Sequence, residues 1–396
     1  MKRSNEIALP TSLRDRLAAG HPWVYRNHLP EDMRLPSGTW VRLRCGGWSG
    51  WGLWDASGPI AIRVYSVARQ PDDRLIDARI RRAWDLRASV RQGETDAYRW
   101  VFGEGDGLPG ITVDRYGRYA SIASYSAGAA TLIPAVVAGL RACDRSLAGV
   151  VARSRDDDSG RGGVELVWGE APPERVEVSE HGLRFVADLY GGQKTGLFLD
   201  HRENRRFIEW HSAGRSVLNC FAYTGAFSLY ALRGGAASVI SADIGKGLAE
   251  DAAENIRLSR LDERRHSFVT EDCFALLGRY AAEGRRFDMV ILDPPSFARN
   301  RESRFAAQRA YTRINELALR CIKDGGWLAS ASCTSQVGPE AFKEALAAAG
   351  AQAKKTIQIV HEVGQPIDHP VPAGFPEGRY LKFVFGRISA TDGDLV

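Results

Sequence analysis

The chain has 396 residues, of which 44% are hydrophobic and 26% are charged. These ordinary values exclude a disordered chain, a coiled coil and a collagen-like fibre, and the length predicts two or three domains. No apolar run reaches the roughly 20 residues that span a bilayer, and no long apolar stretch follows the N-terminus, so we expect a cytoplasmic protein. The net charge of +5 permits a nucleic-acid partner without requiring one.

The six cysteines are scattered along the chain, without the paired spacing of a zinc site, so we expect no bound metal. Five of them are expected to be small, buried hydrophobic side chains: Cys45, Cys143, Cys220, Cys273 and Cys321. The sixth, Cys333, follows a predicted strand and is a candidate for chemistry.

The first 70 or so residues predict a small antiparallel barrel or sheet. Residues 38–44 and 60–65 alternate apolar and polar side chains, and glycines and a proline lie between them. Five of the ten tryptophans fall here. Aromatic side chains interleaved with arginine can stack RNA bases, but they more often form the core of a small barrel.

The next region begins with a predicted helix over residues 72–90, whose apolar residues recur on one face. Residues 103–110 contain four glycines and a proline. This segment indicates a tight structural turn rather than a phosphate cradle, because Glu104 and Asp106 would repel an anion. Residues 154–163 predict a surface loop or hairpin tip, and Pro172 and Pro173 mark a link to the last region.

From about Ser179, apolar strands alternate with amphipathic helices, which predicts an α/β fold with a mostly parallel sheet covered on both faces. Ligands of such sheets bind beyond the carboxyl ends of the strands. The expected strands are residues 216–221, 237–243, 266–270, 287–293 and 327–332, and the expected helices are residues 226–233, 246–259, 274–282 and 303–323.

Three successive strand ends favour a site for S-adenosylmethionine. The first strand runs into a turn with the single glycine Gly225, and the missing G-x-G-x-x-G disfavours a nicotinamide dehydrogenase. Asp243 ends the second strand, where a carboxylate can accept both ribose hydroxyls of an adenosine. Asp272 follows the third strand and can accept from an adenine amino group. Acids at strand ends also often cap the next helix.

The fourth and fifth strand ends supply the candidate catalytic residues, Asp293 and Cys333. Pro294 and Pro295 hold Asp293 in a rigid, extended turn that points it at a planar substrate. A Cys333 thiolate that adds to C6 of cytosine makes C5 reactive enough to take a methyl group. Asp293 can hydrogen-bond the base edge and favour the protonated ring.

The chain resembles the bacterial and archaeal family of large-subunit ribosomal RNA cytosine-C5 methyltransferases that carry an N-terminal PUA domain. The resemblance covers almost the whole chain. It is carried by residues 21–25, 103–115, 193–202, 221–227, 293–297, 332–334, 368–370 and 376–382.

This resemblance implies a small β-barrel PUA domain over residues 1–70, a central α+β domain over residues 71–178 and a Rossmann-like class I methyltransferase domain over residues 179–396. It implies 23S rRNA as the RNA partner, no membrane, and a homodimer as one permitted assembly. It also implies Cys333 as the nucleophile. The candidate cofactor contacts are Lys194, Thr195, Phe198, Asn219, Phe221, Tyr223, Thr224, Gly225, Ala226, Phe227, Asp243, Asp272, Asp293 and Pro294.

Two departures from the family pattern bear on the site. Asn219 stands where many relatives have Asp, which weakens the expected hold on the cofactor's ammonium but keeps an accepting oxygen. The residues after Cys333 also differ from the commoner pattern.

Two other functions stay open: N-methylation of a guanine or adenine, because Asp-Pro-Pro-aromatic turns also serve amino groups, and a non-catalytic RNA-binding or assembly factor.

Overall fold

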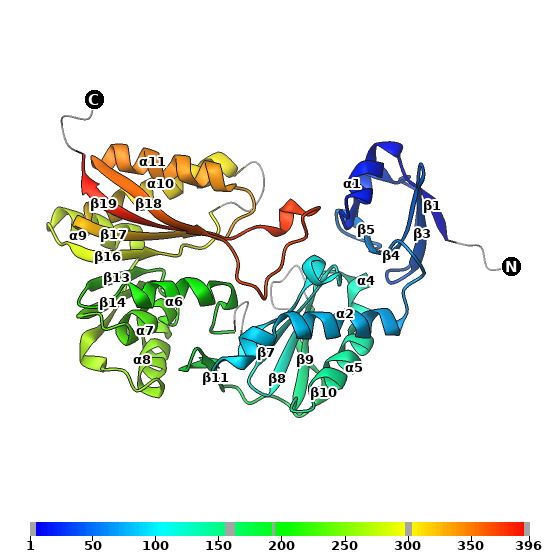
Figure 1. Ribbon diagram of the computed structural model, residues 1–396, viewed down its shortest axis with the longest axis horizontal. Helices are drawn as coiled ribbons and strands as arrows, with labels where there is room; N and C mark the ends of the chain where they lie inside the picture. Colours follow the sequence, from blue (N-terminus) through cyan, green and yellow to red (C-terminus); the bar gives the residue numbers. More distant parts are fainter. Residues whose placement is uncertain (1–4, 155–162, 192–194, 298–302, 392–396) are drawn as a thin grey trace. The chain divides into compact units, whose positions relative to one another are not determined.

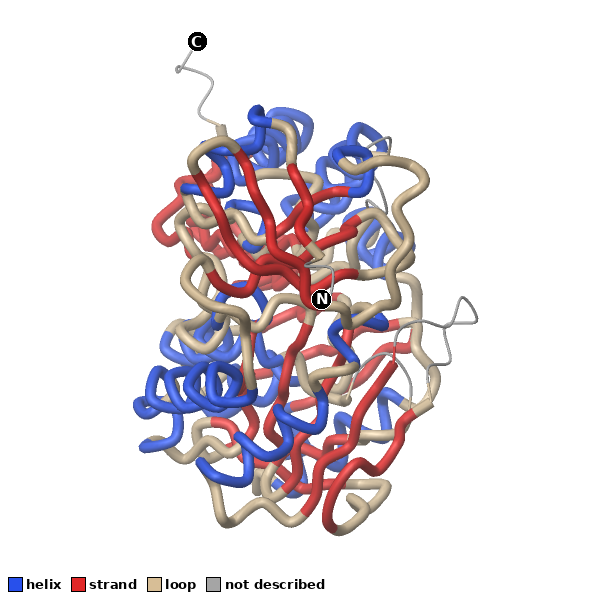
Figure 2. The backbone as a smooth tube through the Cα atoms, turned by 90° about the vertical axis from the view of Figure 1, so that its right-hand side faces the viewer, coloured by secondary structure: helices blue, strands red, loops and turns tan. Residues whose placement is uncertain are grey.

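The structure is a computed structural model that describes residues 5–154, 163–191, 195–297 and 303–391. The chain forms two compact units, each built from several stretches of sequence. The first unit holds Met1–His181, Ala187–Thr195 and Ile367–Gly378, and the second holds Gly182–Val186, Gly196–Pro366 and Arg379–Val396. Both contain strands and helices (Figures 1 and 2). Among the described residues, no helix is long and apolar enough to cross a membrane.

The N-terminal part of the first unit is a five-stranded sheet with the order β1-β3-β4-β5-β2. All of its pairs are antiparallel except β1 with β3. The alternation expected over residues 38–44 appears in β3, whose buried residues Val41, Leu43 and Cys45 enter the core. The elements are β1 Glu6–Ala8, η1 Thr11–Leu13, α1 Arg14–Ala18, β2 Trp23–Tyr25, η2 Arg26–His28, β3 Trp40–Cys45, β4 Trp48–Trp54 and β5 Ile60–Ser66.

The tryptophans of this sheet divide between core and surface. Trp54 is buried in the core, whereas Trp23, Trp40, Trp48 and Trp51 are half-buried. The guanidinium carbon of Arg42 lies 5.9 Å from the centroid of the Trp51 ring.

A second five-stranded sheet of the first unit has the order β10-β9-β8-β7-β6 and packs against helices. Residues 155–162, between β9 and β10, lie outside the described residues, and the predicted hairpin tip falls on them. The elements are α2 Asp73–Leu86, α3 Ala88–Gln92, β6 Ala97–Phe102, η3 Gly103–Asp106, β7 Ile111–Tyr116, β8 Tyr119–Ser124, α4 Ala127–Ala130, α5 Ile133–Cys143, β9 Gly149–Ser154, β10 Val164–Gly169 and β11 Val176–Glu180.

The single helix expected over residues 72–90 is divided in two. Asp72 caps α2 as the sequence indicates, because its side chain accepts from the amide of Leu75. The helix α2 ends at Leu86. The backbone of the next residue, Arg87, leaves the helical conformation (φ −89°, ψ 11°), and its side chain is fully buried against Asp106. No glycine or proline marks this break, so the local sequence gives no sign of it.

The glycine-rich segment is a structural turn, as interpreted from its carboxylates. Residues Gly103–Asp106 form η3, which ends at Gly107 in the left-handed conformation (φ +71°). Glu104 accepts from the indole of Trp23 at 2.8 Å. The Asp106 carboxylate binds both terminal nitrogens of Arg87, at 2.6 and 2.7 Å.

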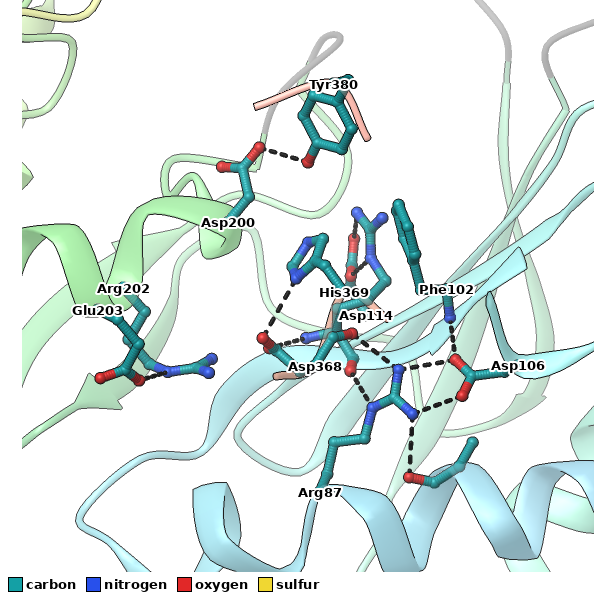
Figure 3. A network of polar contacts seen from close by, with 12 residues as sticks. Arg87, Phe102, Asp106, Asp114, Asp200, Arg202, Glu203, Asp368, His369 and Tyr380 are labelled. Atoms are coloured by element: carbon teal, nitrogen blue, oxygen red, sulfur yellow. Dashed lines mark hydrogen bonds and ion pairs between the residues drawn. The ribbon is translucent and has the colours of Figure 1, made fainter. Parts of the chain in front are cut away.

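The segment Ile367–Gly378, which we call the strap, belongs to the first unit although it lies between β18 and β19 in the chain. Its Asp368 accepts from the backbone amide of Arg99 through the carboxylate and from Arg87 through the carbonyl (Figure 3). Its Phe375 lies 4.6 Å from the ring of Trp23. The strap therefore contacts both sheets of the first unit.

The second unit is built on a seven-stranded sheet with the order β15-β14-β13-β16-β17-β19-β18. The first five strands are parallel and β19 is antiparallel to both neighbours. Helices α10 and α11 cover one face, while α6, α7 and α8 lie on the other (Figure 1). The elements are β12 Leu183–Ala187, η4 Leu199–His201, α6 Arg202–Trp210, β13 Ser216–Cys220, α7 Ala226–Arg233, β14 Ser238–Asp243, α8 Leu248–Leu258, η5 Glu263–Arg265, β15 His266–Thr270, α9 Cys273–Ala282, β16 Phe287–Leu292, α10 Arg304–Arg320, β17 Ile322–Ser332, α11 Pro339–Ala353, β18 Lys355–Val363 and β19 Lys382–Ala390. The short helix η6 Pro376–Gly378 lies in the strap and belongs to the first unit.

The predicted strand–helix alternation is present in order, and the expected α/β class is confirmed. The main difference is β17, which begins at Ile322 rather than Trp327. Gly325 and Gly326 indicate a turn in the sequence, so the earlier start of β17 is not evident there. The strand order reverses at β13, between β14 and β16, and this switch point is where open α/β sheets bind ligands.

Candidate active site

The predicted site residues of the second unit lie at one edge of its sheet. Strands β13, β14, β15, β16 and β17 are parallel, so their carboxyl ends meet at that edge. Asp243 is the last residue of β14, Asp293 follows β16 and Cys333 follows β17.

The turn after β13 has a strained backbone. Phe221 (φ +57°) and Tyr223 (φ +49°) adopt left-handed conformations that side-chain-bearing residues rarely use, and Gly225 (φ +82°) follows them. A Cβ at Gly225 would lie 3.1 Å from the Cβ of Ala252, so the glycine also allows close approach of α8. Such strain gathers at ligand sites, where the surrounding structure holds it in place.

Asp243 holds this turn. Its Oδ2 accepts from the amide of Tyr223 at 2.9 Å, and its Oδ1 accepts from the amide of Gly245 at 3.0 Å. A carboxylate has about four acceptor positions, so two remain for the hydroxyls of a ribose. Asp272 is exposed and caps α9, accepting from Ala275 at 3.0 Å, which is the helix-capping alternative noted from the sequence.

Asn219 is buried beneath the strand end. Its Nδ2 donates to the hydroxyl of Ser228 at 3.0 Å, and its Oδ1 has no hydrogen-bond partner among the described residues. Ser228 continues the chain of hydrogen bonds to Ser241, which contacts His266 at 2.8 Å. The Asn219 side chain therefore links β13 to α7 and β14, and its cofactor contact stays a prediction.

The candidate segment before η4 divides between the units. Lys194 lies outside the described residues, and the Thr195 hydroxyl hydrogen-bonds with that of Tyr116 in the first unit. In the second unit, the Phe198 ring lies 5.3 Å from the ring of Tyr223. The carbonyl of Gly196 accepts from Thr224 at 2.7 Å. This part of the segment thus packs on the turn after β13.

The residues present fit S-adenosylmethionine. The turn has one glycine and no pyrophosphate cradle, Asp243 keeps acceptor capacity for a ribose, and the buried Oδ1 of Asn219 lacks a donor. Ala226 and Phe227 begin α7 directly behind the turn.

Asp293 contacts a histidine that the sequence did not single out. His201 Nε2 lies 3.2 Å from Asp293 Oδ1, and Asn204 Nδ2 lies 3.0 Å from His201 Nδ1. Burial lowers the pKa of His201, but the negative charges of Asp293 and Asp200 outweigh this effect and the net shift is upward. Pro294 is buried, and the next helix, α10, begins only at Arg304, so the two prolines do not start a helix.

Cys333 is half-buried at the end of β17 and is not in a disulfide. Its neighbour Ser332 donates to the hydroxyl of Tyr311 at 3.0 Å. Burial raises the pKa of Tyr311 to about 12, and the charges of Cys333 and Asp293 add to that rise. Both candidate catalytic groups, Cys333 and Asp293, therefore influence the pKa of the Tyr311 phenol.

The other cysteines largely match expectation. Cys45, Cys220, Cys273 and Cys321 are buried, and only Cys143 differs, because it is half-buried beside the core of the first unit. Among the described residues, no group of three or more His, Cys, Asp or Glu side chains is placed to hold a metal ion.

Lys382 also lies at this sheet edge. It is the first residue of β19 and pairs in register with Ser332. His201 and Lys382 fall inside the segments 193–202 and 376–382 quoted for the family resemblance, which was the only signal for them. Tyr311, in the middle of α10, had none.

The comparisons agree with this geometry. Residues 134–374 match the family model for S-adenosylmethionine-dependent methyltransferases, and residues 7–67 match the model for a PUA-like domain. The crystal structure of SMU.776 complexed with SAH superposes with a TM-score of 0.86 at 23% identity, covering 96% of this chain and 99% of that one. A Streptococcus mutans structure gives a TM-score of 0.84 at 21% identity with the same coverages, 96% and 99%. At these identities the likeness concerns the fold alone.

Curated relatives are similar over nearly the whole chain. The ribosomal RNA large subunit methyltransferase I of Erwinia tasmaniensis is 37% identical over 91% of this chain and 94% of its own length. The protein of that name from Serratia proteamaculans is 36% identical over 91% and 94%. The chain therefore belongs to the S-adenosylmethionine-dependent methyltransferases of the ribosomal RNA large subunit methyltransferase I family, with a PUA-like domain near its N-terminus.

Proposed function

We propose that this methyltransferase forms 5-methylcytidine in 23S rRNA, with Cys333 as the nucleophile and Asp293 as the residue that binds the base edge. The observation that carries the proposal is the position of Asp293 directly after β16 and of Cys333 directly after β17, because these two strands are neighbours and parallel. The names of the curated relatives support an RNA of the large ribosomal subunit. A PUA-like domain, in which the half-buried Trp51 lies beside Arg42, supports RNA binding.

In the proposed reaction, the Cys333 thiolate forms a bond from Sγ to C6 of the cytosine. The electron pair of the C5–C6 double bond then moves to C5, which becomes nucleophilic. The Asp293 carboxylate accepts a hydrogen bond from the base edge and favours the ring with its extra proton, which offsets the negative charge that the thiolate brings. The contact with His201 fixes the carboxylate for this role.

When bound, S-adenosylmethionine supplies the electrophilic methyl group that C5 takes up. The C5 proton then leaves to a base, its electron pair re-forms the C5–C6 double bond, and the Sγ–C6 bond breaks, so that the Cys333 thiolate is regenerated. We assign cofactor binding to Phe221 and Tyr223–Phe227 in the turn after β13. The other residues assigned to this role are Lys194, Thr195, Phe198, Asn219, Asp243, Asp272, Asp293 and Pro294. We further propose that the protein is cytoplasmic and forms a homodimer. Analytical ultracentrifugation measures the mass of the assembly and so tests the dimer.

The test is methyl transfer to large-subunit rRNA by the Cys333→Ala variant. We expect the variant to bind S-adenosylmethionine but to lose methyl transfer, whereas Cys143→Ala, a half-buried thiol of the first unit, keeps it. Wild-type protein should form a covalent complex with RNA that carries 5-fluorocytosine, because no C5 proton can leave. Methyl transfer retained by Cys333→Ala would exclude the thiol mechanism and favour N-methylation of a purine. Absence of cofactor binding in the wild type would favour a non-catalytic RNA-binding factor.

A further inference from the structure

Lys382 is a buried cation at the catalytic edge of the sheet. Its residue is 3% exposed, and it opens β19 directly opposite Ser332, the residue that precedes Cys333. Lysine is almost never fully buried unless it is paired, because the charged form loses its hydration. The ammonium of Lys382 therefore needs interactions within the site that compensate for its lost hydration.

The contacts of Lys382 are backbone carbonyls. Its Nζ donates to the carbonyl of Thr334, which immediately follows Cys333, and to that of Tyr380 at 2.8 Å. No carboxylate of the described residues forms an ion pair with it. Two carbonyl dipoles orient the ammonium and fix the turn that carries the thiol, but they supply no negative charge.

The ionisable groups around Lys382 indicate that the anion that compensates its ammonium charge is the Cys333 thiolate. Burial lowers the pKa of Lys382 to about 8, the charge of Cys333 acts in the opposite direction, and Arg379 lowers the pKa further. The charges of Cys333 and of Asp293, which follows β16, both raise the pKa of Tyr311 in α10. Tyr311 is neutral at ordinary pH, since its pKa is raised to about 12.

We propose that Lys382 is a positioning residue for the nucleophile: its ammonium stabilises the Cys333 thiolate, and its bonds to the Thr334 and Tyr380 carbonyls fix the strand end that presents the thiol. The inference rests on the proposed function, in which Cys333 attacks the base. A cysteine whose thiolate faces a cation is a better nucleophile at neutral pH, because more of it is ionised. An opposite charge within about 4–6 Å shifts a pKa by about 1–3 units.

The test measures the thiol itself rather than methyl transfer. Iodoacetamide alkylates thiolates, so the rate of Cys333 alkylation against pH, followed by peptide mass spectrometry, gives the midpoint of thiol ionisation. We expect Lys382→Met, which keeps the length without the charge, to raise this midpoint by about one unit or more. Lys382→Arg should restore most of the shift. The control is Lys323→Met, at the opposite end of β17, where the lysine pairs with Asp288 at 2.8 Å, and it should leave the midpoint unchanged.

An unchanged midpoint in folded Lys382→Met would overturn the proposal, because a purely structural lysine would not move it. If that variant does not fold, the reciprocal measurement decides. The chain has eight lysines, so the side-chain NMR signal of Lys382 can be resolved and titrated. Replacing Cys333 by Ser should lower the pKa of Lys382, and an unchanged titration would refute the pairing. Failure of the proposed function shows separately, as methyl transfer retained by Cys333→Ala.

Discussion

The buried Arg87–Asp106 pair allows a quantitative test of how the first unit is held together. The Arg87 side chain is 0% exposed and that of Asp106 is 5% exposed. Arg87 also donates to the carbonyls of Asp368 in the strap, at 2.7 Å, and of Arg99, at 3.0 Å (Figure 3). Arg87→Met removes all of these donors at once while keeping much of the side-chain volume.

The expected loss follows from the charge left behind. After the substitution, the Asp106 carboxylate keeps the amide of Phe102 as a partner but no cation. Removing one member of a buried ion pair costs about 3–5 kcal/mol, because the remaining charge is uncompensated. The double variant Arg87→Met/Asp106→Asn leaves no such charge, so it should lose less stability than the single variant. Arg81→Met breaks an exposed pair with Asp77 on the same helix and should cost less than about 1 kcal/mol.

Hydrogen exchange suits this measurement, because two compact units need not unfold in a single transition. The slowest amides of β6 and β7 report the opening free energy of the first unit. In Arg87→Met we expect the opening free energy of these amides to fall by about 3–5 kcal/mol. The amides of the strap should also exchange faster. A loss below about 1 kcal/mol, or a double variant less stable than the single one, would show that Arg87 does not stabilise the first unit by neutralising the buried Asp106 carboxylate.

Three further predictions concern pH and cofactor binding. The pKa of His201 is raised in the folded state, so its contribution to stability is fully present below the unfolded value of 6.5 and is lost as pH rises through the folded-state pKa. His201→Gln should therefore destabilise the protein more at pH 5.5 than at pH 8 in urea unfolding, and equal losses at both pH values would contradict this. Burial lowers the pKa of His266 to about 4, so its neutral form is favoured and stability is lost as pH falls from 6.5 towards 4, by about 2–3 kcal/mol. His266→Gln should reduce this acid sensitivity in thermal melts, and an unchanged pH profile would count against it. Asp243→Ala should weaken S-adenosylmethionine binding at least tenfold in calorimetry, whereas Asp262→Ala, at η5, should not, and equal affinities would remove Asp243 from the cofactor site.

The sheet of the second unit could be predicted from the sequence because its signals are local. Apolar runs and amphipathic helices alternate over short distances, and residues 266–270 and 226–233 have the predicted limits. Once the strands are known to be parallel, the positions of Asp243, Asp293 and Cys333 at one edge follow without further information.

The contacts that complete the site could not be predicted in this way. His201 meets Asp293, and Lys382 meets the carbonyl of Thr334, across long stretches of chain that the fold brings together. The break after α2 is a similar case, because it occurs at Arg87, which pairs with Asp106, and no helix-breaking residue marks it. Tertiary partners of this kind leave no trace in local patterns.

Bisulfite sequencing of 23S rRNA can compare cells that contain the wild-type protein, lack it, or carry only Cys333→Ala, and it tests the proposed cytosine methylation at the RNA itself. Bisulfite converts cytosine but spares 5-methylcytosine. We expect one cytosine that is protected with the wild-type protein and unprotected in both other strains. Protection that is the same in all three strains would contradict cytosine-C5 methylation by Cys333, and mass spectrometry of methylated purines would then be the next experiment.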